Sequence, residues 1–347
     1  MYGKLNSSIV VHRLAADLGL PTLADPVESI LSFCHWKVKH FLAEFAVCAS
    51  PAELLRIVAD KLGTRICEIH SIAALLGLQH EYLGRGELGF VNLVEELNSP
   101  DTFGITYRLI KPLAIWEPPF VSVVDCRGEK KQRIYHTKWH EVAHLLVLTD
   151  QTRSALRRTH DPGLMKSAEE TLVDLIAGEF SFYPELVMPR IHGEISFERI
   201  DEIRVAVCPE ASVYSSILNL AKLWPTPCVW LEAKLGYKKG QLHGVQACFS
   251  FDAEAEEPAP LRAVHVNANA EARRLRIGII PNFRVPAESI IFRVFYGCSD
   301  FGDAEENLSM WTSSNGKCLQ NCPVRVRAKR LGDSVHVLVT PLADKLI

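Results

Sequence analysis

The sequence predicts an α+β protein in which helices dominate the first two thirds of the chain and strands the last third. Apolar residues recur at helical spacing before residue 236, whereas short strand-like segments separated by turn residues prevail after residue 260. A length of 347 residues is too great for one hydrophobic core and suits two or three domains. The hydrophobic content of 48% supports packed cores rather than disorder.

The expected elements fall into four successive parts. Residues 1–50 form a helical extension, with apolar residues at helical spacing over 27–47. Residues 51–192 contain a buried strand at 120–125 and two helices, over 134–148 and 168–180, with a turn at 161–163 between them. Residues 193–240 contain helical patterns at 196–207, 210–222 and 229–235. Residues 241–347 begin with a linker and then show strand patterns at 261–266, 275–280, 289–296, 324–328 and 335–340, with a hairpin-like turn at 329–333.

Charge and composition limit the classes of function. The net charge of −3 and the isoelectric point near 6.5 give no overall attraction to nucleic acid or membranes, and so disfavour direct nucleic-acid binding. The N-terminus leads into no continuous apolar stretch, which predicts neither a signal peptide nor a membrane span. The ten scattered cysteines are then more typical of reduced thiols, and the expected location is the cytoplasm.

The segment His140-Glu141-Val142-Ala143-His144 carries the strongest chemical signal. On a helix, residues four apart share a face, so both imidazoles can bind one zinc ion. Glu141 follows His140 directly and is therefore rotated by one position around the helix. From there it can reach a water molecule at that metal and act as the general base for this water. The pattern therefore predicts a zinc site of the hydrolase type.

A catalytic zinc needs a third protein ligand and an open position for water. In the helix expected over 168–180, Glu170 and Asp174 share a face by their spacing of four. Glu170 would complete the ligand set, and Asp174 would accept the free N–H of a ligating histidine and fix its orientation. Glu169 and Glu179 stay open as alternative ligands. The simpler interpretation of Glu169-Glu170 is a solvated helix start.

These motifs together resemble those of the ImmA/IrrE metallopeptidases. That family shows a His-Glu-x-x-His helix, then Glu-x-x-x-(Asn/Asp), then Met-Pro, matched here by His140 to His144, Glu170 with Asp174, and Met188-Pro189. The resemblance covers roughly residues 50–235 and extends upstream to a helix over 51–62 and a strand over 63–67. The chain departs from the family at Lys138 and Trp139, where small or aliphatic residues are usual.

The resemblance implies a cytoplasmic, gluzincin-like zinc endopeptidase, with manganese as the alternative metal. It implies a protein substrate, a helix-turn-helix repressor, whose cleavage would regulate transcription in a stress response. Residues 193–240 look similar to a helix-turn-helix-like segment. They lack a basic recognition helix. Residues 241–347 look similar to a mixed α/β, GAF-type sensor domain that would bind a small-molecule ligand.

The expected reaction is hydrolysis of a peptide bond at zinc held by His140, His144 and Glu170, with Glu141 moving the proton. Tyr135, His136, His160 and Tyr183 are open candidates for stabilising the oxyanion. The alternative from another class is a non-catalytic regulator that binds ligand, protein or DNA through the segments after residue 193. A housekeeping peptidase is a third interpretation.

Overall fold

The computed structural model of the chain describes residues 3–21, 25–44, 48–110, 112, 114, 116–149, 155–159, 167–237, 259–312, 316 and 318–342. It divides into two compact units. Unit 1 comprises Met1–Val187 and Arg204–Ser212, and unit 2 comprises Met188–Ile203 and Val213–Ile347. Each unit contains its own sheet, and the whole is a mixed α+β structure, as the sequence predicts.

The N-terminal extension is helical, as expected. It consists of α1 (Gly3–Asn6), α2 (Ile9–Asp17) and α3 (Pro26–Leu42). Asp25 caps α3 by accepting the backbone N–H of Glu28, and Pro26 occupies the first turn, where its missing N–H costs nothing. Buried residues four apart on α3 (Ile30, Cys34 and Val38) form the face that packs against the rest of unit 1.

Unit 1 is built on a four-stranded sheet in the order β1-β3-β2-β4. These strands are β1 (Thr64–Ile69), β3 (Phe120–Asp125), β2 (Thr102–Arg108) and β4 (Ala155–Thr159). β1 runs parallel to β3, whereas β2 runs antiparallel to both β3 and β4. The helix α4 (Pro51–Leu62) precedes β1, and β3 coincides with the strand expected at 120–125.

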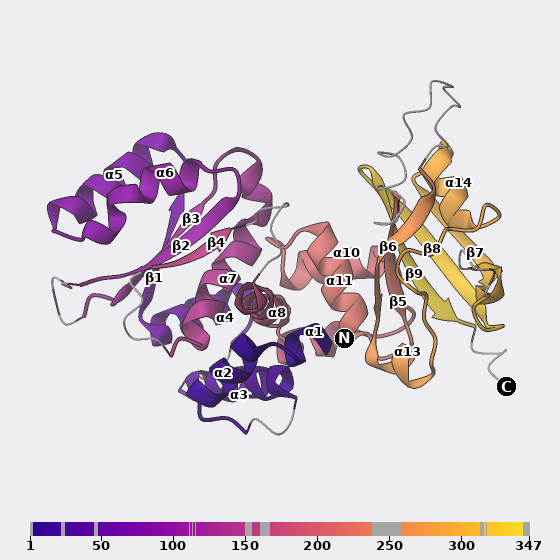
Figure 1. Cartoon of the computed structure of the whole chain (residues 1–347), viewed down its shortest axis with the longest axis horizontal. Helices are drawn as coiled ribbons and strands as arrows, with labels where there is room; N and C mark the ends of the chain where they lie inside the picture. The colour runs from indigo at the N-terminus through magenta and orange to yellow at the C-terminus, as the bar shows by residue number, and fades with distance from the viewer. Residues whose placement is uncertain are drawn as a thin grey trace. The chain divides into compact units, whose positions relative to one another are not determined.

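Helices cover both faces of this sheet (Figure 1). α5 (Ile72–Gly84) and α6 (Leu93–Asn98), joined by the 3-10 helix η1 (Leu88–Asn92), lie on one face, and α7 (Ile134–Leu146) lies on the other. Side chains alternate along β2, so Ile105 and Tyr107 enter the core under α5 and α6, while Gly104 and Thr106 face α7. α8 (Ala168–Ser181) packs against α7 and is followed by α9 (Pro184–Val187).

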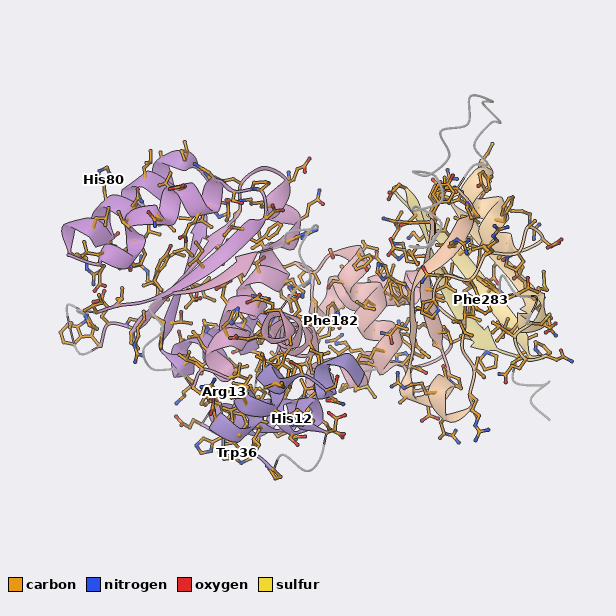
Figure 2. The ribbon with its side chains drawn as sticks, viewed as in Figure 1. His12, Arg13, Trp36, His80, Phe182 and Phe283 are labelled. Carbon is orange, nitrogen blue, oxygen red and sulfur yellow. The ribbon has the colours of Figure 1, made fainter. Side chains whose placement is uncertain are left out.

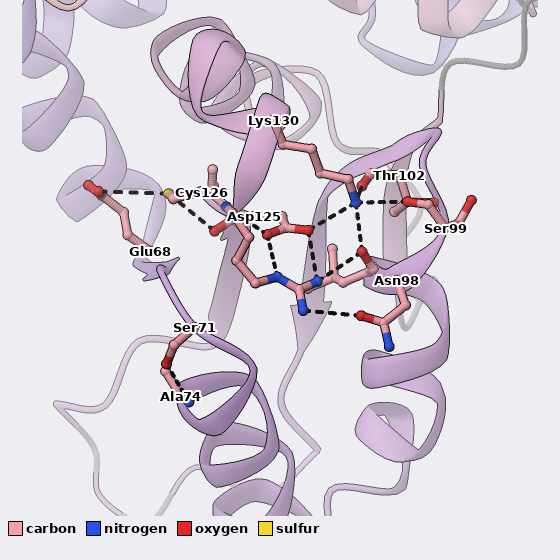
Figure 3. A network of polar contacts seen from close by, with 12 residues as sticks. Glu68, Ser71, Ala74, Asn98, Ser99, Thr102, Asp125, Cys126 and Lys130 are labelled. Carbon is pink, nitrogen blue, oxygen red and sulfur yellow. Dashed lines mark hydrogen bonds and ion pairs between the residues drawn. The ribbon is translucent and has the colours of Figure 1, made fainter.

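A buried ion-pair network fixes the connection from β3 into α7, which runs through η2 (Gly128–Arg133) (Figure 3). The Asp125 side chain is 1% exposed and accepts from Arg127 Nε at 2.8 Å and from Lys130 Nζ at 2.9 Å. Lys130 Nζ also donates to the carbonyl oxygens of Leu97, Ser99 and Thr102. The basic turn thus joins the end of β3 to the segment between α6 and β2 and sets where α7 begins.

Unit 2 contains a five-stranded antiparallel sheet in the order β6-β5-β9-β8-β7. Its strands are β5 (Val229–Leu235), β6 (Leu261–Ala268), β7 (Phe301–Asn307), β8 (Pro323–Leu331) and β9 (Ser334–Pro341). The helix α14 (Ile290–Tyr296) packs on the apolar face of β7, β8 and β9. The described part of unit 2 also contains η3 (Met188–Arg190), α11 (Val213–Leu223), α13 (Ala270–Arg274) and η4 (Leu308–Met310). The residues of α10 (Phe197–Val207) up to Ile203 belong to unit 2, and those from Arg204 belong to unit 1.

Three expectations for this region are wrong. Residues 229–235 form a strand instead of a helix, because Val229, Leu231 and Ala233 alternate into the core between two partner strands. Residues 289–296 form α14 instead of a strand, because Ser289 caps the helix and Ile291 and Val294, three apart, enter the core. Residues 275–280 form no strand, although Ile277 and Ile279 are buried.

Other expectations in unit 2 hold. The strands at 261–266, 324–328 and 335–340 are present, and Gly332-Asp333 forms the hairpin turn between β8 and β9. The edge strand β7 was not foreseen, because its sequence is mainly acidic and small. The turn expected at 161–163 and residues 238–258 of the linker lie outside the described residues. None of the helices in the described ranges has the length and hydrophobicity that crossing a membrane requires.

Candidate metal centre

The two histidines of the motif lie side by side on the buried face of α7. His140 is 1% exposed and His144 4% exposed, and they stand one helical turn apart. Their Nε2 atoms are 3.2 Å apart. Both side chains therefore present a nitrogen to the same point, as the spacing predicts.

Glu170 joins them from the first turn of α8. Ser167 caps this helix by accepting the backbone N–H of Glu170 at 3.1 Å, which fixes where the helix starts and which way Glu170 points. Glu170 Oε2 is 3.2 Å from His140 Nε2, and Glu170 Oε1 is 3.4 Å from His144 Nε2. The structure thus brings the three expected ligands together.

The spacing of these three side chains fits a tetrahedral zinc ion. Zinc binds histidine nitrogen and carboxylate oxygen at about 2.0–2.2 Å, and a tetrahedral angle then separates two ligand atoms by about 3.3–3.6 Å. The two Nε2 atoms are 3.2 Å apart, and each lies 3.2 or 3.4 Å from one of the two carboxylate oxygens of Glu170, which is close to this value. The donor set of two imidazoles and one carboxylate leaves one tetrahedral position for water.

Asp174 lies behind His140, as expected from its position one turn after Glu170. Its Oδ1 accepts a hydrogen bond from His140 Nδ1 at 2.9 Å. Because the proton then resides on Nδ1, the lone pair of Nε2 points toward Glu170 and His144. Of the alternative ligands, Glu179 instead pairs with His35 on α3 at 3.5 Å, while Glu169 lines a neighbouring cavity.

A second group of possible ligands shares one residue with this set. Donor atoms of His136, His140 and Asp174 also lie within 4.8 Å of one another. The first set uses Nε2 of His140 and leaves Nδ1 for Asp174, which is the arrangement usual around a metal-bound histidine. The second set would require Asp174 to give up that supporting role.

Glu141 is fully buried and turned toward the sheet. Its Oε2 accepts a hydrogen bond of 2.7 Å from Thr106 on β2. The Thr106 hydroxyl is in turn 2.7 Å from that of Ser122 on β3, which is 2.9 Å from that of Thr64 on β1. A chain of three buried hydroxyls from three adjacent strands thus ends on the carboxylate of Glu141.

Gly104 gives Glu141 the space it occupies. A Cβ atom at this position would lie 2.7 Å from Glu141 Oε1 and 2.8 Å from Thr137 Cγ2, both closer than real Cβ contacts allow. Sequence reasoning missed Gly104, Thr106, Ser122 and Thr64. The alternation of β2 could have placed Gly104 and Thr106 on one face, but only the sheet register places that face under α7.

The four oxyanion candidates differ in their surroundings. Tyr135 is buried and donates to the carbonyl oxygen of Ser181 at 2.5 Å, and burial raises its pKa. Tyr183 is 1% exposed and stacks on Phe180, and burial raises its pKa as well. Of the three candidates that the structure describes, His136 alone belongs to a group of possible metal ligands, which it shares with His140. His160 lies outside the described residues.

Trp139 and Lys138, which differ from the motif pattern that the chain resembles, have structural roles. Trp139 is fully buried and stacks on Phe180 of α8, with ring centroids 6.2 Å apart. Lys138 Nζ lies 2.7 Å from Glu68 and 3.3 Å from Glu210. Burial would lower the pKa of Lys138, but its hydrogen bonds and charge pairing with Glu68 and Glu210 outweigh this and raise it. Both residues thus hold α7 in unit 1.

Comparison with models of known protein families finds no match to the chain, and comparison with curated proteins finds none either.

Proposed function

We propose that this protein is a zinc-dependent endopeptidase of the ImmA/IrrE type. The observation that supports it best is the convergence of His140, His144 and Glu170 at separations of 3.2–3.4 Å, with Asp174 orienting His140. A zinc ion held there would supply a Lewis acid that polarises a peptide carbonyl and lowers the pKa of water.

The protein's own residues perform the proton transfers. Glu141 accepts the proton of the attacking water and delivers it to the leaving amine. Thr106 holds one carboxylate oxygen of Glu141, so its side chain does not have to be ordered when substrate binds. His136 is the described candidate for donating a hydrogen bond to the oxyanion.

We propose a helix-turn-helix repressor as the substrate, and a sensor role for unit 2. Both rest on the resemblance of the motifs. The alternative of DNA binding through the basic strand β8 is disfavoured, because Arg325 pairs with Asp303 at 2.9 Å and Arg327 with Glu194 at 2.7 Å. The Arg327 side chain is only 6% exposed, so these two arginines, already paired with carboxylates, offer little charge to phosphate.

Metal content tests the site. We expect about one zinc per chain in the wild-type protein by plasma mass spectrometry, and a sharp loss in Glu170→Ala. Glu169→Ala, one residue earlier on the same helix, is the matched control and should keep its zinc. Full occupancy in Glu170→Ala with loss in His136→Ala would move the site to the second ligand group.

Cleavage of a co-expressed helix-turn-helix repressor tests the reaction. Glu141→Gln should keep the zinc and slow cleavage by about a hundred- to ten-thousand-fold, because only the general base is lost. Unchanged cleavage by this variant would contradict the mechanism. Degradation of unrelated unfolded proteins would favour a housekeeping peptidase instead.

A further inference from the structure

A cavity of about 810 Å³ lies directly beside the candidate metal centre. His144 belongs to both, since its ring is a proposed ligand and also lines the cavity. Glu169, the residue before the third ligand, lines it from α8. Because consecutive Cα atoms are only about 3.8 Å apart, a peptide with its carbonyl at the metal centre has its neighbouring side chains within reach of this cavity.

The opposite wall comes from the N-terminal extension. Val10, Leu14, Arg13 and Asp17 of α2 line the cavity, and their spacing of three and four places them on one helical face (Figure 2, which labels Arg13). Val11 and Ala15, fully buried on another face, hold α2 against the body of unit 1, where it contacts α3 and α8. The wall is thus a fixed part of the unit.

The lining is mixed: about half of its described residues are aliphatic and half are polar or charged. Val10 and Leu14 from α2, with Val147 and Leu148 after α7, supply aliphatic surface. Arg13 and Asp17 form an exposed ion pair at 4.0 Å, with side chains 82% and 49% exposed. An aliphatic or aromatic side chain that packs on these aliphatic residues would lose water on entering, which favours its binding.

From this placement we propose that the cavity is a specificity subsite, which holds a bulky apolar side chain of the substrate beside the scissile bond. The N-terminal extension, through α2, then decides which segment of a protein is cut. The inference rests on the proposed function for the identity of its occupant, the peptide substrate.

Peptide binding to the full-length Glu141→Gln protein tests this without interference from cleavage. The probes are fluorescein-labelled pentapeptides, Ala-Ala-X-Ala-Ala, with leucine, phenylalanine, serine or aspartate at X, and the readout is fluorescence anisotropy. We expect the leucine and phenylalanine peptides to bind at least about tenfold more tightly than the serine peptide.

Two variants of α2 in this background separate the subsite from general effects. Val10→Asp places a charge in the lining and should abolish the apolar preference. Ala16→Asp makes the same change at an exposed position of α2 that is not among the lining residues, and should retain the preference. Ile9→Asp is the second lining variant should Val10→Asp fail to fold, because Ile9 is 84% exposed.

The outcomes distinguish this inference from the proposed function. Equal affinity for all four peptides, or the same preference in the lining variant and in Ala16→Asp, would overturn the subsite, even in a protein that binds zinc and cleaves. An apolar preference that Val10→Asp removes would support the subsite. If that protein held no zinc and the wild type cut nothing, the peptidase proposal alone would fail.

Discussion

At the residue scale, a hydroxyl on β2 helps to orient Glu141. Thr106 donates to its carboxylate at 2.7 Å inside a fully buried site, where hydrogen bonds to a charged group contribute about 1.5–3 kcal/mol. Thr106→Val keeps the shape but removes the donor. We expect kcat to fall about ten- to a hundredfold, with zinc content and KM unchanged, and Thr106→Ser to restore most of it.

A purely structural role for Thr106 would show a different pattern. The free energy of unfolding would then fall in Thr106→Val while kcat stayed near the wild-type value. Steady-state kinetics on the cleaved repressor and urea unfolding of the same preparations distinguish the two.

Gly104 gives a second prediction at this scale. In Gly104→Ala the new methyl group would meet Glu141 Oε1 at 2.7 Å, so the carboxylate must move. Activity should drop strongly in the variant while bound zinc is retained, because the heavy atoms nearest the added methyl group belong to Glu141 and Thr137 and not to a proposed ligand. Full activity in Gly104→Ala would show that the observed position of Glu141 is not the reactive one.

At the element scale, Asp125 anchors the connection between β3 and α7. Burial alone would raise the pKa of Asp125, but hydrogen bonds from Arg127 and Lys130 outweigh this and hold it below its ordinary value. A depressed folded-state pKa stabilises the protein above the unfolded-state value of about 3.9. That stability is lost as the pH falls through the folded-state pKa.

Asp125→Asn should therefore destabilise the protein at pH 7 by about 3–5 kcal/mol, because Arg127 and Lys130 lose their buried counter-charge. The difference from wild type should shrink as the pH falls below about 4, because the unfolded wild-type chain then takes up a proton that the folded protein, with its depressed pKa, binds only at lower pH. Urea unfolding of both proteins between pH 3 and 7 measures this. A constant difference over that range would rule out the charge as its cause.

At the scale of the whole molecule, the division into two units predicts how the protein unfolds. The proposed metal ligands all belong to unit 1, whereas the core around β5, β8 and β9 belongs to unit 2. A ligand that binds only the folded state stabilises it by about 2.7 kcal/mol when the free ligand concentration is a hundred times its Kd. Zinc should therefore shift one of two calorimetric transitions upward and leave the other in place. A single transition that moves as a whole would contradict independent units.

The relative positions of side chains that lie one turn apart on a helix could be predicted from the sequence alone. The face shared by His140 and His144, and that shared by Glu170 and Asp174, follow from helical geometry. The alternating residues of β8 follow from pleated geometry, and β3 follows from its short, largely apolar sequence. Within such a window the backbone fixes where each side chain points. The three predicted ligands and Asp174 are the residues that the structure brings together.

Contacts between distant segments needed the tertiary structure. The partners of Glu141 lie on three strands whose order, β1-β3-β2, no local pattern encodes, so Thr64, Thr106 and Ser122 carry no signal in the sequence. Residues 229–235 and 289–296 were misassigned for the same reason. Short apolar segments fit a helix or a strand almost equally well, and the neighbours they pack against decide between the two.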